Sequence, residues 1–234
     1  MTPVIFGRKA RVAADEAEIE AIDDQPTDGP DEADAEDQEY AAADAFDPRA
    51  QGPFDSEEVD LDADEVERVT FGPLVITPFE GLNLQLHGDS ETGTIKAILA
   101  AYDNSGLELA LFAAPRTGGL ANDLREETIE EAGQQGGHAE AAPGPFGTEV
   151  RRVLPMEGPE GEQLFHVSRI WLVEGPRWLL RGTLMGRAAM AEGEQPPADV
   201  FVEFFRNIVV LRDDQPRVPG ELIHLALPDA AAQG

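Results

Sequence analysis

The chain has 234 residues, with 47 Asp and Glu against 17 Lys and Arg, so its formal net charge is −30. A surface this negative repels phosphate backbones, which excludes sequence-independent binding to nucleic acid. The chain has no cysteine, which excludes disulfides, thiolate metal sites and a cysteine nucleophile. Its content of 41% hydrophobic residues is enough for a hydrophobic core at this length.

The excess of acidic residues is concentrated near the N-terminus. Residues 1–67 hold 23 acids and 4 bases, a net of −19, whereas the rest of the chain has a net of −11. Residues 13–50 are mostly Ala, Asp and Glu, and such a segment cannot offset an ordering entropy of roughly 1–2 kcal/mol per residue. We therefore expect residues 1–57 to be a disordered acidic tail. It is either a solubilising extension, or a segment that competes for a basic partner or folds over a basic face of its own domain.

We expect no targeting signal in the first residues. Three apolar residues, Val4–Phe6, precede the basic Arg8 and Lys9, and a signal-peptide core needs roughly 7–15. Nowhere does the sequence approach the ~20 consecutive apolar residues of a membrane span. We expect a cytoplasmic protein.

The first predicted strands follow the tail. Residues 82–87 alternate leucine with polar side chains, which is typical of a half-buried strand. Residues 94–102 and 107–113 flank Asp103-Asn104-Ser105-Gly106. This tetrapeptide predicts a β-hairpin whose type I turn is closed by a left-handed glycine.

Two segments have helical periodicity, and strands lie between them. In residues 120–132 apolar side chains recur at helical spacing, and glycines follow directly, which predicts a helix and its end. Residues 146–155, 163–173 and 177–185 predict a three-stranded meander. A second helix is predicted from Pro196-Pro197 onward, with a wide apolar stripe formed by Val200, Phe201, Phe204, Phe205, Ile208 and Val209.

Together these elements predict a single α+β domain over residues 58–228, closed by a last short strand at 223–227. We expect an antiparallel sheet of about seven or eight strands, mostly connected by hairpins, with two helices packed on it. Residues 229–234 are expected to be a flexible C-terminus.

Familiar catalytic and metal-binding motifs are absent from the sequence. Asp60, Asp62 and Asp64 resemble the start of a calcium loop, but Glu65 stands where that loop needs glycine. There is no phosphate-binding Gly-rich loop, no Gly-x-Ser-x-Gly and no His-Glu-x-x-His. We therefore expect no catalytic residue, no cofactor and no metal site.

One hairpin has an unusual composition. Residues 169–187 contain both tryptophans of the chain and four arginines. Arginine binds carboxylate bidentately and lies over aromatic rings, so Arg169, Arg177, Trp178 and Arg181 form a candidate site for an anionic ligand. The alternative is that the tryptophans fill the core and the arginines pair with carboxylates of the chain.

Arg116 is a second candidate for binding an anion. It precedes Thr117-Gly118-Gly119 at the start of the first predicted helix, where free N–H groups favour a negative ligand. The glycines are equally well explained as loop-forming residues.

The same segments carry a family resemblance. Its motifs are Phe112–Arg116, the Leu-Arg-Glu-Glu helix at 124–127, Gly144–Glu149, Gly175–Gly182 and Leu225–Pro228. In this order they resemble an uncharacterised actinobacterial family, domain-of-unknown-function family 3710, over residues 54–228. The resemblance implies no activity. By the order of its elements the chain is also similar to Mog1/PsbP-like domains, which are mostly binding modules, although fold does not determine function.

Two functional hypotheses follow. The first is a non-enzymatic protein-interaction or regulatory module with an unidentified protein partner, in which the acidic tail tunes encounters. The second is an anionic small-ligand-binding protein, or an enzyme using carboxylates, with its site at hairpin 169–187.

Overall fold

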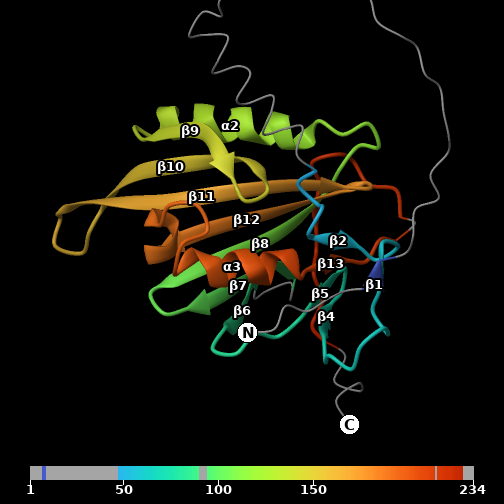
Figure 1. The fold of residues 1–234 in the computed structure, drawn as a ribbon. Coiled ribbons are helices and arrows are strands. Elements are labelled where there is room, and N and C mark those ends of the chain that lie inside the picture. The colour runs from blue at the N-terminus through green and yellow to red at the C-terminus, as the bar shows by residue number, and fades with distance from the viewer. Residues whose placement is uncertain (1–6, 9–46, 90–93, 214, 229–234) are drawn as a thin grey trace, which may run out of the picture.

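The protein is built around one large antiparallel sheet that carries a helix on each face (Figure 1). The structure, a computed structural model, describes residues 7–8, 47–89, 94–213 and 215–228. A smaller sheet lies at one end of the large one. The α+β class and the antiparallel sheet expected from the sequence are confirmed. Most of the expected acidic tail, and residues 229–234, lie outside the described residues.

Eight strands form the main sheet, in the spatial order β6-β7-β8-β12-β11-β10-β9, with β14 paired to the end of β8. Their bounds are β6 Asn83–Asp89, β7 Thr94–Tyr102, β8 Ser105–Ala113, β9 His138–Gly144, β10 Gly147–Glu157, β11 Gln163–Gly175, β12 Trp178–Gly186 and β14 Leu222–Ile223. The meander expected after the first helix is therefore present as β10, β11 and β12. Strand β9 was not predicted, because its buried side chains are the small Ala139 and Ala142 and give a weak apolar signal.

The β7–β8 hairpin is tighter than the sequence predicts. Tyr102 pairs with Ser105, so only Asp103 and Asn104 form the turn. A two-residue hairpin turn needs a left-handed residue at its first position, and Asp103 takes that conformation with φ of 52°. The predicted left-handed Gly106 is thus wrong. This glycine lies inside β8, where an added Cβ would come within 2.8 Å of the Leu99 side chain.

The smaller sheet was not predicted. Its order is β2-β13-β5-β4, with β2 Phe54–Asp55, β13 Val209–Val210, β5 Leu74–Ile76 and β4 Val69–Phe71. Strand β13 runs parallel to β2 and antiparallel to β5. A further two-residue pair joins β1, Gly7–Arg8, to β3, Val59–Asp60. Both residues of β2 are buried, so the packed part of the chain includes residues before 58.

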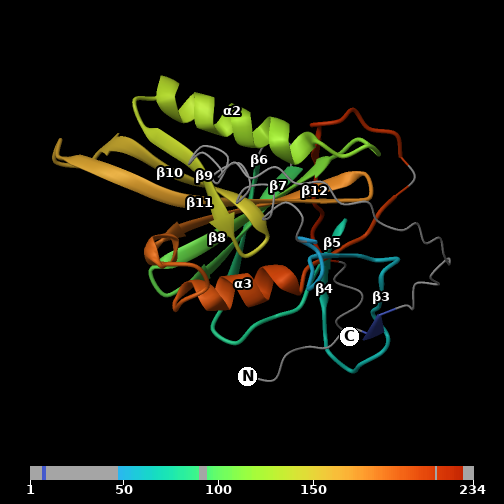
Figure 2. The ribbon, with the colours of Figure 1, turned by 45° about the horizontal axis from the view of Figure 1, so that its top comes forward.

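The two helices cover opposite faces of the main sheet (Figure 2). Helix α2 is Leu120–Gln134 and helix α3 is Ala198–Arg206, while a short 3₁₀ helix, η1, spans Arg187–Met190. Because successive side chains of a strand point to opposite faces, Trp171 and Val173 of β11 pack in the cluster of α3, and Ile170 packs in the cluster of α2. In the part of the chain that the structure describes, neither helix has the length and apolarity required to cross a membrane.

The apolar stripe expected for the second helix is confirmed, but the helix ends earlier than predicted. Phe201, Phe204 and Phe205 are buried in the main core. Asn207 ends the helix, since its side-chain amide donates to the carbonyl oxygen of Glu203 at 2.7 Å. Val209, which the sequence pattern places in the helix, is instead the first residue of β13. Val209 is nevertheless buried, like the phenylalanines of the stripe.

Substitution of Phe205 tests the packing of this core. The Phe205 ring centroid lies 4.7 Å from that of Phe146 and 5.3 Å from that of Trp171. We expect Phe205→Ala to lower the free energy of unfolding by about 3–5 kcal/mol, because it leaves a cavity among packed rings. The measurement is urea denaturation, with Phe165→Ala as the matched control. Phe165 is 61% exposed, so its loss should stay within about 0.5 kcal/mol; equal losses in the two variants would contradict the assigned core.

Candidate anion-binding site

Both tryptophans of the 169–187 hairpin donate their indole N–H to a buried carboxylate. Trp171 Nε1 donates to Glu149 Oε2 at 2.9 Å, and Trp178 Nε1 donates to Asp55 Oδ2 at 2.9 Å. The two indoles and the two carboxylates are all exposed by 1% or less. The tryptophans are therefore core residues. Each is hydrogen-bonded to a buried carboxylate, whose negative charge needs a positive partner in the core.

Arg169 neutralises the first of these carboxylates. Its Nε donates to the two oxygens of Glu149 at 2.9 and 3.0 Å, and its Nη1 donates to the carbonyl oxygens of Gly193 and Ala191. Arg169 is itself only 2% exposed. The structure thus places this predicted site residue in a buried ion pair.

Arg181 also lies apart from the other predicted residues. It follows Trp178 by three positions on β12 and so points to the opposite face, the face of α2. Its guanidinium lies 5.1 Å from the centroid of the Phe112 ring. Burial lowers the pKa of Arg181, and the charge of Glu108 opposes this shift.

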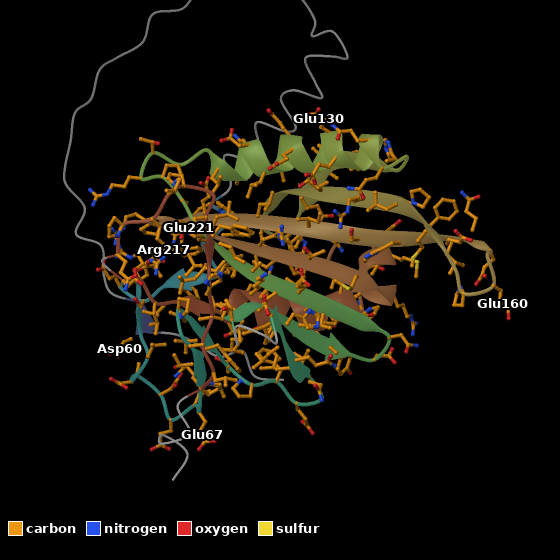
Figure 3. All side chains as sticks on the ribbon, turned by 180° about the vertical axis from the view of Figure 1, so that it is seen from behind. Asp60, Glu67, Glu130, Glu160, Arg217 and Glu221 are labelled. Atoms are coloured by element: carbon orange, nitrogen blue, oxygen red, sulfur yellow. The ribbon has the colours of Figure 1, made fainter. Side chains whose placement is uncertain are left out.

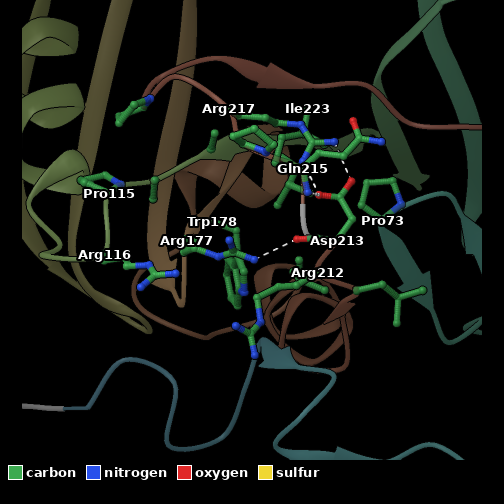
Figure 4. A pocket seen from close by; sticks show the side chains of 17 residues that line it. Pro73, Pro115, Arg116, Arg177, Trp178, Arg212, Asp213, Gln215, Arg217 and Ile223 are labelled. Carbon is green, nitrogen blue, oxygen red and sulfur yellow. Dashed lines mark hydrogen bonds and ion pairs between the residues drawn. The ribbon is translucent and has the colours of Figure 1, made fainter.

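Three of the predicted residues do come together. Arg116, Arg177 and Trp178 line one cavity of about 240 Å³ (Figure 4). It lies where the end of the main sheet meets the smaller sheet. The remaining lining residues are Pro73, Leu111, Ala113, Ala114, Pro115, Val210, Leu211, Arg212, Asp213, Gln215, Pro216, Arg217, Pro219 and Ile223.

Two of the four arginines in this cavity are neutralised. Arg212 pairs with Asp55 at 2.8 Å and with Glu57, and these two carboxylates raise the pKa of Arg212 although burial works against them. Arg217 holds both oxygens of Asp213, at 2.5 and 2.7 Å. These hydrogen bonds lower the pKa of Asp213. Both pairs therefore form fixed, charged parts of the wall.

The other two arginines have no such partner within the described ranges. Arg177 Nη2 donates to the main-chain carbonyl oxygen of Asp213 at 2.8 Å, drawn as a dashed line in Figure 4. Arg116 is exposed at the rim. Among the residues described by the structure, no carboxylate forms an ion pair with either guanidinium. Two positive charges thus face the cavity in a chain that has 47 acidic residues.

The N-terminus of α2 is already occupied by a carboxylate of the chain. The backbone N–H groups of Gly119 and Leu120 each donate to Glu174 at 3.0 Å. This is the interaction that a helix N-terminus offers to an anion. The anion position that the sequence suggests beside Arg116 is therefore filled by Glu174, and Arg116 contributes to the cavity instead.

Acidic side chains lie over the outer surface and also at the cavity, where Asp213 is in the lining and Glu221 lies beside Arg217 (Figure 3). Figure 3 shows Glu67, Glu130 and Glu160 on separate parts of the periphery. Over the described ranges, no group of three or more histidine, aspartate or glutamate side chains is placed to hold a metal ion. Sequence reasoning missed Arg212 and Arg217, whose segment has no periodicity and reaches the cavity only through the tertiary fold.

Comparisons with known proteins define a family but no activity. The family model described as "Protein of unknown function (DUF3710)" matches residues 52–234. A search of curated proteins finds no match.

Two solved structures are similar at low identity. A crystal structure from Bacteroides thetaiotaomicron VPI-5482 shares 11% identity, with a TM-score of 0.36 over 66% of this chain. This chain covers 52% of that one, about half of its length. The solution structure of cyanobacterial PsbP (CyanoP) from Synechocystis sp. PCC 6803 shares 12% identity, with a TM-score of 0.34 over 68% of this chain and 99% of that one. At these TM-scores neither likeness bears on function.

The buried Glu149–Arg169 pair gives a first prediction for this region. Glu149→Gln keeps the shape of the side chain but leaves the Arg169 charge buried and uncompensated. We expect a loss of about 3–5 kcal/mol in the free energy of unfolding, measured by urea denaturation at neutral pH. Glu140→Gln on β9 is the control, because that side chain is 60% exposed and its change should be small. A small effect of Glu149→Gln would show that the pair is not what neutralises Arg169.

The Asp213–Arg217 pair predicts a pH dependence. The pKa of Asp213 is lowered on folding, so the pair stabilises the protein above the unfolded pKa, and this stabilisation is lost as the pH falls through the folded pKa. Because Asp213 is 46% exposed, we expect the pair to contribute at most about 1 kcal/mol to the free energy of unfolding. The free energies of unfolding of the parent and of Asp213→Asn should differ at neutral pH and converge in acid. A difference that does not change with pH would exclude the ion pair as its source.

Proposed function

Since the chain belongs to the family described as "Protein of unknown function (DUF3710)", we propose its function from the cavity: it is a non-enzymatic interaction module that binds an anionic group between Arg116 and Arg177. The observation that carries this proposal is the division among the four arginines. Arg212 and Arg217 are paired with carboxylates, whereas Arg116 and Arg177 face the cavity without an ion pair to any described residue. A guanidinium offers planar pairs of N–H donors that match the oxygens of a carboxylate or phosphate.

The chemistry of the lining supports binding rather than catalysis. Among the described lining residues there is no serine, threonine, tyrosine, lysine or histidine. Guanidinium groups stay protonated in proteins, so they do not act as general bases. The one carboxylate, Asp213, is held by both of its oxygens. Such a set orients and neutralises an anion without a group that attacks it.

The proposal extends to the way the module meets its partners. The anionic group belongs either to a small molecule or to an acidic segment of a protein partner, and we place both in the cytoplasm. The acidic residues of segment 1–57 would lower the rate of encounter with acidic partners by repulsion. A net charge of −30 likewise disfavours nucleic acid as the partner.

Substitution of Arg177 tests this function. We expect Arg177→Ala in the full chain to weaken anion binding at least about tenfold, because hydrogen bonds to charged groups contribute roughly 1.5–3 kcal/mol. The measurement is isothermal titration calorimetry with benzoate, inorganic phosphate and hexaglutamate. Arg187→Ala is the matched control, since that arginine is 69% exposed at the other end of β12. If no anion of this panel binds the parent protein, or if both variants lose binding equally, the proposed function is wrong.

A further inference from the structure

We propose that the ligand of this cavity is a compact monocarboxylate: one carboxylate group on a small apolar body. This inference rests on the proposed function and deepens it by naming the class of ligand. Three properties of the cavity lead to it, namely the apolar character of its interior, the number of free charges at its rim, and its volume.

The wall of the cavity includes apolar side chains that a ligand can reach. The half-buried ones are Pro73, Pro115, Leu211 and Ile223. Leu111, Ala113, Ala114, Trp178 and Val210 are exposed by 8% or less and add little accessible surface. Trp178 is 1% exposed and its indole N–H is already donated to Asp55, so this side chain offers a ligand no free donor. A polar body placed here would lose its hydrogen bonds to water without replacement, at a cost of roughly 1–3 kcal/mol per group. The inner part of the ligand is therefore apolar.

The rim of the cavity suits one negative charge. Arg116 and Arg177 supply the guanidinium groups that have no carboxylate partner in the described part of the chain, and two such groups match the two oxygens of one carboxylate. The neighbouring Asp213 is partly exposed and ionised, since Arg217 lowers its pKa. A second negative group on the ligand would lie near this carboxylate and be repelled by it. This arrangement favours a monocarboxylate over a phosphate dianion.

The volume limits the size of the apolar body. The cavity has a volume of about 240 Å³. Sites for drug-sized ligands measure roughly 300–1,000 Å³. A single ring or a short branched chain fits this space, whereas a nucleotide or a long acyl chain exceeds it. An acidic side chain of a peptide would reach the arginines but would leave the apolar interior unfilled.

Calorimetry with matched probes tests the class of ligand on the full chain. Benzoate combines the charge and the apolar body, benzamide has the body without the charge, and acetate has the charge without the body. We expect benzoate to bind at least about tenfold more tightly than either of these probes, and more tightly than inorganic phosphate or hexaglutamate. We expect Arg116→Ala and Arg177→Ala to remove this preference and Arg187→Ala to keep it. Unchanged melting temperatures of the three variants will show that they are folded.

The outcomes separate this inference from the proposed function. If phosphate or hexaglutamate binds through Arg177 while benzoate binds no better than acetate, the monocarboxylate class is overturned and the anion site stands. If benzamide binds as tightly as benzoate, the charge is not recognised, and both the class and the anion site are overturned. The same holds if benzoate binds equally well to the parent and to Arg177→Ala.

Discussion

Asp55 is the residue on which the arrangement of the two sheets depends. It is fully buried in β2 of the smaller sheet, accepts a hydrogen bond from Trp178 of the main sheet, and pairs with Arg212 in the segment after β13. Removing one partner of a buried charge costs about 3–5 kcal/mol, so the three segments are held in fixed relation. Trp178 and Arg212 also line the cavity, and the same carboxylate therefore shapes the site.

The structure uses arginine in two ways, and the presence of a carboxylate partner distinguishes them. Arg169 neutralises Glu149 in the interior, where Trp171 donates to the same carboxylate. This arrangement repeats that of Asp55, Trp178 and Arg212. Arginines of this kind stabilise the fold, because their charge neutralises a buried carboxylate of the chain. Arg116 and Arg177 differ because their charge is directed to solvent and cavity, which is the property expected of a group that binds an anion.

The sequence predicts the helices and strands whose apolar periodicity extends over many residues. It does not predict the short strands that tertiary contacts hold in place. The phenylalanines of α3 and the strands of the meander follow directly from apolar spacing, but β2 and β13 have two residues each and show no period. Hairpin 169–187 stands out in the sequence by its composition. Its side chains diverge, because neighbours along a strand face opposite sides. Trp178 and Arg212 both bind Asp55, and Trp178 lies 123 positions after Asp55 in the sequence. No local sequence pattern indicates a contact over such a separation.

The most direct test of the anion site is a ¹⁵N–¹H spectrum of the full chain recorded during titration with benzoate. The chain has two tryptophans and hence two indole cross-peaks, which Trp171→Phe and Trp178→Phe will assign. Trp178 lines the cavity, whereas Trp171 packs in the core between Phe146 and Phe205. We expect benzoate to shift the Trp178 indole peak and the amide peaks near Arg116 and Arg177, and to leave the Trp171 peak in place. A saturable shift confined to other parts of the chain, or no shift at any concentration, would contradict an anion site in this cavity.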